Sequence, residues 1–213
     1  MSSSPTVKEP FKARVQFTLQ TTLRKSYGPN DFLQSISGKI LARCDNDEQE
    51  SCAGYITGSL VQFGRALDHR IAPDRLGDGI SGDVSEYWEE LFDVETGRWK
   101  EPLEDAFEIG ESDLLIIDCV EIHPRFRGQE IGLFVVDRTI DIFGPACGLV
   151  ACKPWPLQFT PAFMNNRRRL QRLQPPNTDE GEAVRKLRSY WSGVGFRPVG
   201  QAGIFAMSMS QRQ

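Results

Sequence analysis

Two long apolar runs with one apolar helical segment between them constrain the fold of this 213-residue chain more than any other feature. The first run, residues 113–122, is nearly continuously apolar, which is typical of a central strand buried on both faces. Pro124 ends it, because proline has no N–H to donate to a sheet. Residues 130–143 predict a helix and residues 147–153 a second buried strand. Strand, helix and strand within about 40 residues predict a right-handed βαβ unit with parallel strands.

Shorter signals on both sides of this unit predict the rest of the sheet. Alternating or short apolar runs predict strands at residues 11–23, 38–44, 52–63, 196–199 and 204–209. A helix is expected over residues 182–191, ended by Gly193. Together these elements predict an α/β (α+β) fold with helices flanking a sheet.

The chain is expected to be a single domain over residues 11–213, preceded by a mobile tail at residues 1–10 that is rich in Ser and Pro. Two less regular stretches, at about 64–112 and 154–180, are interpreted as insertions. In the first, a helix is predicted from Asp83, an N-cap candidate, onward. Its apolar face comprises Trp88, Leu91 and Phe92.

Composition excludes several classes of protein. The net charge of −4 disfavours a strongly basic nucleic-acid binder. No apolar run approaches the roughly 20 residues of a membrane-spanning helix, and the N-terminal residues lack the apolar core of a signal peptide. Five cysteines without a C-x-x-C pair are interpreted as small buried thiols in a reducing cytosol, so a cytoplasmic location is expected.

Metal and covalent catalysis are also disfavoured. The chain has only two histidines, His69 and His123, and no Cys/His spacing fits a zinc site, so no metal site is predicted. No G-x-S-x-G elbow is present to carry a nucleophilic serine. A covalent hydrolase is therefore not expected.

The charge is distributed unevenly along the chain. Residues 74–113 contain 14 acidic and three basic residues, a net charge of −11, and the remaining residues carry +7. One interpretation is a solvated insertion paired loosely with basic neighbours. The other is an acidic rim that attracts a cationic substrate, which predicts a polyamine, an aminoglycoside-like molecule or a lysine-bearing acceptor.

The junction after the first buried strand is the most informative place for chemistry. Arg127, Gly128 and Gly132 lie between the end of that strand and the start of the helix. In a parallel pair this junction is at the carboxyl edge, where ligands commonly bind. The free N–H groups of a helix start suit a phosphate or pyrophosphate, and the alternative is a plain helix start with two packing glycines. The glycine spacing fits neither a Walker A loop nor a dinucleotide fingerprint.

Two segments here resemble the GNAT superfamily of acyl-CoA-dependent N-acyltransferases. That family has a strand ending in V-x-V, often followed by x-P, and then Q/R-x-x-G-x-G/A at a helix start. Here Val120-Glu121-Ile122-His123-Pro124 is followed by Arg127-Gly128-Gln129-Glu130-Ile131-Gly132. The family's second signature is a helix ending in Y-x-x-x-G-F, which the segment from Leu187 to Phe196 resembles. The resemblance extends loosely over residues 11–209 and is specific over 113–153 and 182–199.

The resemblance implies a mixed, mostly antiparallel sheet whose two central parallel strands splay apart to hold acetyl-CoA as co-substrate. The acceptor would be a small-molecule or peptide amine that attacks the thioester directly, with no nucleic acid and no membrane involved. A backbone N–H near Val120 or Glu121 would polarise the thioester carbonyl. The implied cofactor-binding residues are Val120, Glu121, Ile122, Arg127, Gly128, Gln129, Glu130, Ile131 and Gly132.

Two residues depart from the family's pattern. Glu130 occupies a glycine position of the loop, where its carboxylate would repel a pyrophosphate unless it turns to solvent. Trp191 occupies the usual position of the acid tyrosine, which leaves the neighbouring Tyr190 as the candidate general acid. The alternative for Tyr190 is a packing aromatic side chain.

Asp118 is the candidate general base or water-holding residue, because a carboxylate inside an apolar strand must be paired, exposed to a cleft or shifted in pKa. The alternative is an aspartate bonded to neighbouring backbone or to an arginine. Strand alternation directs Glu121 to the opposite face unless a bulge intervenes. His123 is interpreted as a loop residue. The basic residues are expected to form a solvated face or to meet the phosphates of CoA or an acidic partner; they are Arg167, Arg168, Arg169, Arg172, Arg185, Lys186 and Arg188.

The sequence therefore predicts an acetyl-CoA-dependent N-acetyltransferase. Two alternatives stay open. One is a degenerate GNAT-fold binding or interaction module without catalysis, which Glu130 and Trp191 favour. The other is an acyltransferase for a longer chain or a different acceptor atom.

Overall fold

A mixed sheet organises the protein. The computed structural model describes residues 12–19, 27–43, 48–78, 82–93 and 95–212. Within these residues seven strands form one sheet in the order β1-β2-β3-β4-β5-β7-β6. The strands are β1 (Ala13–Leu19), β2 (Leu33–Ala42), β3 (Ser51–Val61), β4 (Asp113–Ile122), β5 (Cys147–Cys152), β6 (Arg197–Val199) and β7 (Ile204–Ser208). Neighbours β4 and β5 are parallel and the other neighbouring pairs are antiparallel, which confirms a mixed, mostly antiparallel sheet.

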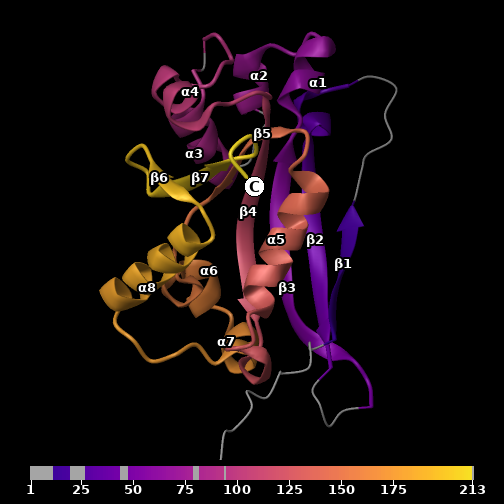
Figure 1. The fold of residues 1–213 in the computed structure, drawn as a ribbon, viewed down its shortest axis with the longest axis vertical. Helices are drawn as coiled ribbons and strands as arrows, with labels where there is room; N and C mark the ends of the chain where they lie inside the picture. Colours follow the sequence, from indigo (N-terminus) through magenta and orange to yellow (C-terminus); the bar gives the residue numbers. More distant parts are fainter. Residues whose placement is uncertain (1–11, 20–26, 44–47, 79–81, 94, 213) are drawn as a thin grey trace, which may run out of the picture.

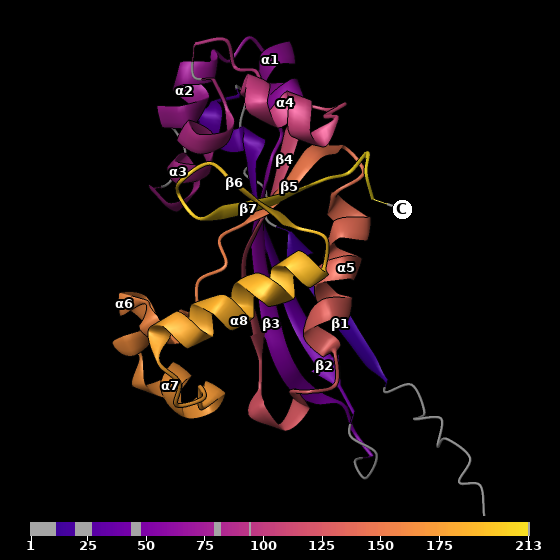
Figure 2. The ribbon, with the colours of Figure 1, turned by 60° about the vertical axis from the view of Figure 1, so that its left-hand side comes forward.

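Helices cover both faces and one end of this sheet (Figure 1). They are α1 (Phe63–Asp68), α2 (Pro73–Asp78), α3 (Gly82–Leu91), α4 (Glu101–Phe107), α5 (Ile131–Phe143), α6 (Pro161–Met164), α7 (Arg167–Leu173) and α8 (Glu180–Gly193). Three 3-10 turns are η1 (Pro29–Phe32), η2 (Pro124–Phe126) and η3 (Leu157–Phe159). In Figure 2, α5 lies on one side of the sheet, α6 and α7 lie on the other, and α8 runs between them.

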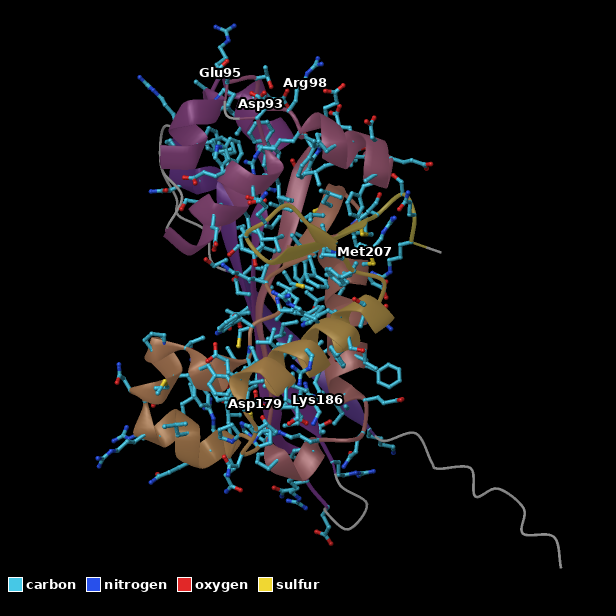
Figure 3. The ribbon with its side chains drawn as sticks, turned by 90° about the vertical axis from the view of Figure 1, so that its left-hand side faces the viewer. Asp93, Glu95, Arg98, Asp179, Lys186 and Met207 are labelled. Atoms are coloured by element: carbon cyan, nitrogen blue, oxygen red, sulfur yellow. The ribbon has the colours of Figure 1, made fainter. Side chains whose placement is uncertain are left out.

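The acidic segment, residues 74–113, and helix α8 lie at different ends of the molecule. Helices α1, α2 and α4 gather at one end of the sheet (Figure 1). Figure 3 shows Asp93 and Glu95 at that end, and Asp179, the N-cap of α8, and Lys186 of α8 toward the other. The charge asymmetry of the sequence therefore becomes a separation in space.

Strand β4 supplies two hydrophobic cores by simple alternation. Leu114 and Ile116 are buried in the core shared with α1, α3 and α4, whereas Leu115 and Ile117 are buried in the core under α5. A strand covered on both faces needs apolar residues at every position, because neither face meets water. The prediction of a central strand at residues 113–122 is confirmed.

A bulge interrupts this alternation at Asp118. Gly58 pairs with Ile117 and Thr57 with Cys119, so Asp118 is an extra residue in β4. An extra residue resets which face the following side chains occupy. Asp118, Cys119 and Glu121 consequently lie on the same face of the sheet, which Ser59 and Thr57 of β3 share. The sequence predicts Glu121 on the face opposite to Asp118 unless a bulge intervenes. The bulge is present, so both carboxylates lie on the same face.

The two parallel strands pair only along the first half of β4. Their last pair is Ile117 with Cys152, after which β4 continues to Ile122 while β5 ends. Beyond β5 the chain leads to α6 on the far side of the sheet (Figure 2). The last residues of β4 therefore have β3 as a neighbour and no partner from β5.

The strands and the helix predicted on both sides of the βαβ unit are confirmed. The two stretches interpreted as irregular insertions, 64–112 and 154–180, contain short helices. Residues 64–112 contain most of α1 and all of α2, α3 and α4, and residues 154–180 contain η3, α6 and α7. Helix α3 confirms the helix predicted from Asp83. The other α-helices in these stretches have four to seven residues, so each presents too few turns for a clear apolar periodicity. None of the described helices is long and apolar enough to cross a membrane.

Gly54 gives a direct test of the close approach between β3 and β4. A Cβ added at Gly54 would lie 1.8 Å from the carbonyl oxygen of Glu121. We expect Gly54→Ala to cost about 3 kcal/mol or more of unfolding free energy, because one strand must move. Thermal and denaturant unfolding measure this loss.

Gly193→Ala is the matched control, since an added Cβ at Gly193 has no heavy atom within 4 Å and the residue lies in α8. That variant should be as stable as the parent protein or slightly more stable. Equal unfolding midpoints for the two variants would contradict the described β3–β4 register.

Candidate functional site

The loop between β4 and α5 leads directly into the first turn of α5. It contains η2, whose Phe126 is buried and anchors the loop to the core. Gly128 has φ +74° and open space where a Cβ would lie. Helix α5 then begins at Ile131 without a side-chain N-cap. The first N–H groups of a helix have no intrahelical partner and carry partial positive charge, so this loop can bind an anion.

Glu130 is in the left-handed region, with φ +60°. Glycine adopts this conformation without strain, and a side chain there costs about 1 kcal/mol. Glu130 is exposed and does not cap the helix. The backbone thus keeps the shape of a glycine position, while the carboxylate adds a negative charge next to the predicted phosphate site.

Arg127, one of the predicted cofactor-binding residues, has its guanidinium bonded to carbonyl groups. Nε donates to the Ile122 carbonyl at 3.0 Å and Nη1 to the Gln174 carbonyl at 3.2 Å, and Nη2 donates to the Leu173 carbonyl. Leu173 is the last residue of α7 and Gln174 its C-cap. A cation there satisfies carbonyls that the helix leaves unpaired. Arg127 therefore joins the loop to α7.

The edge of β4 beyond Ile117 has defined backbone groups. The His123 N–H donates to the Ala53 carbonyl of the β3 chain at 2.8 Å. Alternate residues of an antiparallel strand direct their backbone groups to opposite edges, so Glu121 faces β3 while Val120 and Ile122 face away from it. The predicted contact of the Glu121 backbone with a cofactor is therefore not favoured by this geometry. Val120 offers an N–H and a C=O at the edge that β5 has left.

Tyr190 and Trp191 occupy different environments on α8. Trp191 is buried and packs edge-on against Phe196 at 5.0 Å between ring centroids. Tyr190 is 37% exposed, and its hydroxyl lies against the first turn of α5: a Cβ added at Gly132 would be 3.2 Å from Tyr190 Oη and 3.7 Å from Ile122 Cγ1. Burial raises the pKa of Tyr190 to about 12, so the phenol keeps its proton at neutral pH. The hydroxyl therefore lies beside the end of β4.

Asp118 is exposed on the bulge. The Ser59 hydroxyl donates to its Oδ2 at 3.3 Å. The carboxylate thus lies on the face of β4 that also carries Cys119 and Glu121, consistent with the predicted base or water-holding role and with the alternative of a bonded structural aspartate.

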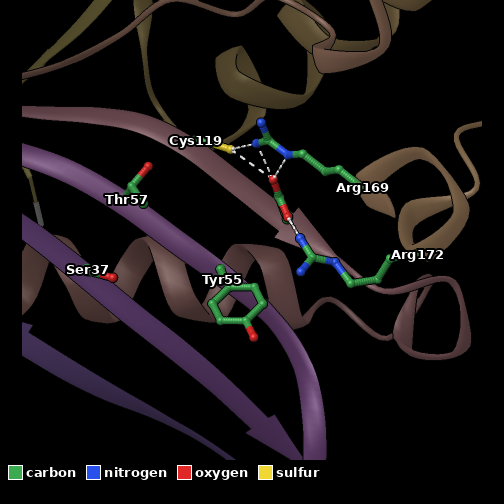
Figure 4. A pocket seen from close by; sticks show the side chains of 7 residues that line it. Ser37, Tyr55, Thr57, Cys119, Arg169 and Arg172 are labelled. Atoms are coloured by element: carbon green, nitrogen blue, oxygen red, sulfur yellow. Dashed lines mark hydrogen bonds and ion pairs between the residues drawn. The ribbon is translucent and has the colours of Figure 1, made fainter. Parts of the chain in front are cut away.

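A pocket of about 310 Å³ lies on this face between the sheet and α7, shown in Figure 4. We call it the α7 pocket. Its lining residues are Ser37 of β2, Tyr55 and Thr57 of β3, Cys119 and Glu121 of β4, and Arg169 and Arg172 of α7. The sequence did not identify this pocket, because its residues come from four separate segments.

Glu121 is the centre of the α7 pocket. Its side chain is 6% exposed and is held by two arginines: Arg169 Nε donates to Oε1 at 2.5 Å, and Arg172 Nη2 donates to Oε2 at 2.8 Å. Burying a carboxylate is costly unless both oxygens are paired, and here both are. The Arg172 guanidinium also lies over the Tyr55 ring, 5.2 Å from its centroid. The spacing of the two arginines on one face of a helix was the signal available in the sequence.

Cys119 also lines the pocket. Arg169 Nη2 donates to its sulfur at 3.6 Å. Burial, with the nearby Glu121 charge, raises the pKa of the Cys119 thiol to about 12. Cys147 and Cys152 are fully buried, as the sequence predicts, and burial raises their pKa values too. The prediction for Cys44 lies outside the described residues.

His123 packs under the end of β4. Its Nδ1 is 2.9 Å from the Cys52 carbonyl, and Nε2 is buried without a hydrogen-bond partner. Burial lowers the pKa of His123, so the neutral ring is favoured. Nδ1 then carries the proton and donates it to that carbonyl. Within the described ranges no three His, Cys, Asp or Glu side chains gather as a metal site would require.

Comparison with known proteins assigns the chain to no family. No family model, no curated protein and no solved structure matches the chain significantly.

Cys119 provides a test of the buried pocket wall. At pH 8 an unperturbed thiol is about one quarter thiolate, whereas a thiol with a pKa of about 12 is about one ten-thousandth thiolate. We expect Cys119 of the folded protein to react with iodoacetamide at least about 100-fold more slowly than glutathione does. Peptide mass spectrometry measures the rate.

The same protein in urea is the control, and there Cys119 should react at the rate of a free thiol. Equal rates in the folded and unfolded protein would contradict the burial of this side chain.

Proposed function

We propose that this chain is an acetyl-CoA-dependent N-acetyltransferase of the GNAT type, which transfers an acetyl group directly to an amine. One observation carries the proposal. The edge of β4 beyond Ile117 and the uncapped start of α5 lie at the same end of the same strand. An acyl-CoA needs both features, since its pantetheine arm has amide groups and its pyrophosphate is an anion.

The pantetheine amides would pair with the Val120 C=O and the Ile122 N–H in the manner of an added strand, which leaves the Val120 N–H for the thioester carbonyl. The Ile122 carbonyl faces the same edge but already accepts from Arg127, so Ile122 would contribute its N–H alone. The backbone from Gly128 to Gly132 would hold the pyrophosphate. The order of the two sequence motifs and the sheet order, with β4 and β5 as the parallel pair, support this assignment.

In the proposed reaction the acceptor nitrogen attacks the thioester carbon. The new C–N bond forms and the C–S bond breaks, and CoA leaves as a thiolate. Asp118 would take a proton from the acceptor ammonium, directly or through a water molecule. Tyr190 would donate its proton to the thiolate and would regain a proton from the nitrogen, which loses its second proton as the amide forms. The raised pKa keeps the phenol protonated at neutral pH and also makes it a weaker acid than an ordinary tyrosine. The Val120 N–H would stabilise the negative charge on the carbonyl oxygen.

A second candidate is a GNAT-like module that binds CoA without catalysis. The Arg127 guanidinium is hydrogen-bonded to carbonyl groups, and Glu130 adds a carboxylate to the loop. Trp191, at the position of the family's acid tyrosine, is buried. Saturable binding of acetyl-CoA without acetylation of any amine, peptide or antibiotic acceptor would favour this candidate.

The acceptor is proposed to be a small-molecule or peptide amine. The acidic segment, which predicts a cationic acceptor, lies mainly at the end of the sheet opposite α7 (Figure 3). Its α3 reaches back toward β5, where Glu86 pairs with Lys153 at 2.5 Å. The one acidic side chain lining the α7 pocket is Glu121, which is already paired.

Acetyl-CoA binding can be tested at Gly128. Both Asp and Asn tolerate the left-handed conformation, and an added Cβ there meets no neighbour within 4 Å. We expect Gly128→Asp to weaken binding of acetyl-CoA at least about tenfold by charge repulsion, with Gly128→Asn as the uncharged control staying within about threefold of the parent protein. Isothermal titration calorimetry measures both. No binding to the parent protein at near-millimolar acetyl-CoA would refute the proposed function.

The acid role can be tested at Tyr190. We expect Tyr190→Phe to lower kcat about 10- to 100-fold and to leave the KM for acetyl-CoA nearly unchanged, because only the proton donor is lost. Trp191→Phe is the matched control: it should lower the unfolding temperature and change kcat by less than about threefold. An unchanged kcat in Tyr190→Phe would remove this residue from the mechanism.

A further inference from the structure

The α7 pocket is lined mainly by hydrogen-bond donors. Glu121 is its one carboxylate, and both of its oxygens already accept from arginines. The two guanidinium groups keep further N–H groups, since each has five and the hydrogen bonds to Glu121 and Cys119 use only some of them. Ser37, Tyr55 and Thr57 also line the pocket; each has a hydroxyl group, and that of Tyr55 is hydrogen-bonded to Cys52. A ligand that fits such a wall must bring acceptors.

The net charge of the side chains that line the α7 pocket is positive. Two guanidinium groups against one carboxylate leave a charge of +1. Outside the lining, Lys39 and Asp118 are both exposed on the same face, and their charges cancel. Hydrogen bonding with Cys52 and burial raise the pKa of Tyr55, and the Cys119 thiol is also neutral, so neither adds a negative charge. One net positive charge matches a carboxylate better than a phosphate dianion.

The pocket lies next to the edge of β4 described above. Cys119 and Glu121, which line it, flank Val120, whose N–H faces that edge. Consecutive residues of a strand are about 3.3 Å apart. A molecule in the pocket is therefore within reach of an acyl group held at Val120.

We infer that the α7 pocket binds the carboxylate of the acceptor, so that the acceptor is an amine that also carries a carboxylate, as an amino acid does. The role as acceptor site depends on the proposed N-acetyltransferase function, while the carboxylate site itself does not. Arg172 and the unused N–H groups of Arg169 bind the carboxylate, and the three hydroxyls line the rest. This class differs from the polyamines and aminoglycoside-like molecules that the acidic segment predicts.

The carboxylate site is tested first without acetyl-CoA. Succinate and its uncharged diamide are titrated into the full-length protein by saturation-transfer NMR. We expect succinate to bind and the diamide to bind at least tenfold more weakly. Arg172→Gln should weaken succinate binding at least fivefold, since Arg169 still pairs with Glu121 and preserves the fold. Arg168→Gln, an exposed residue of the same helix outside the pocket lining, makes the same change in net charge and should have no effect.

The acceptor role is tested by acetyl transfer to amino acids and to their carboxamides. We expect kcat/KM to be at least tenfold higher for the carboxylates, and Arg172→Gln to raise the acceptor KM at least fivefold with the KM for acetyl-CoA unchanged. Unfolding midpoints check that both variants are folded.

The outcomes separate the two proposals. Binding of succinate that depends on Arg172, in a protein that does not bind acetyl-CoA, supports the carboxylate site and rejects the proposed function. Acetyl-CoA binding together with equal binding of succinate and its diamide, or equal use of carboxylates and carboxamides, rejects the carboxylate site and leaves the proposed function standing.

Discussion

Strand β4 has to satisfy two demands at once, and the bulge at Asp118 reconciles them. Up to Ile117 the strand is buried on both faces and alternates between two hydrophobic cores. Beyond the bulge, Cys119 and Glu121 share one face with Asp118 while Val120 and Ile122 pack toward α5. An extra residue at one position therefore places Asp118, Cys119 and Glu121 on one face of the sheet, and Cys119 and Glu121 line the α7 pocket.

The ion pairs of Glu121, together with the buried Leu173, hold α7 against the sheet. Helix α7 has seven residues, and a helix of that length is not stable alone in water. Two of its arginines bind Glu121 on β4, and Arg127 bonds to the carbonyls at its C-terminal end. The buried carboxylate is tolerated because it is fully paired, and the same pairing holds the outer wall of the pocket against the sheet.

The electrostatic layout follows from where the segments pack. The acidic residues 74–113 gather mainly at one end of the sheet, and the arginines of α7 lie at the other (Figures 1 and 3). The net charge of −4 over the whole chain thus conceals a concentration of acidic residues at one end and of arginines at the other. The two ends therefore differ in charge, and the arginines of α7 lie at the end that contains the α7 pocket.

The sequence alone determined the frame of this protein. The runs at 113–122, 130–143 and 147–153 predicted the central strand, helix and strand, because burial on both faces requires continuous apolar residues. The same segment predicted the loop at Gly128 and Glu130, where the backbone does adopt the left-handed conformation. Of the short helices in residues 64–112 and 154–180, the sequence predicted the one that begins near Asp83, and the others escaped prediction because their stability comes from packing rather than from periodicity.

Only the tertiary structure decided how the side chains of the site are used. Arg127 caps α7, Glu121 is buried between Arg169 and Arg172, and Tyr190 lies against the start of α5. Each of these contacts joins residues about 45 to 60 positions apart, so no local pattern encodes them. The bulge at Asp118 likewise depends on the partner strand, because a change of register belongs to a pair of strands and not to one sequence.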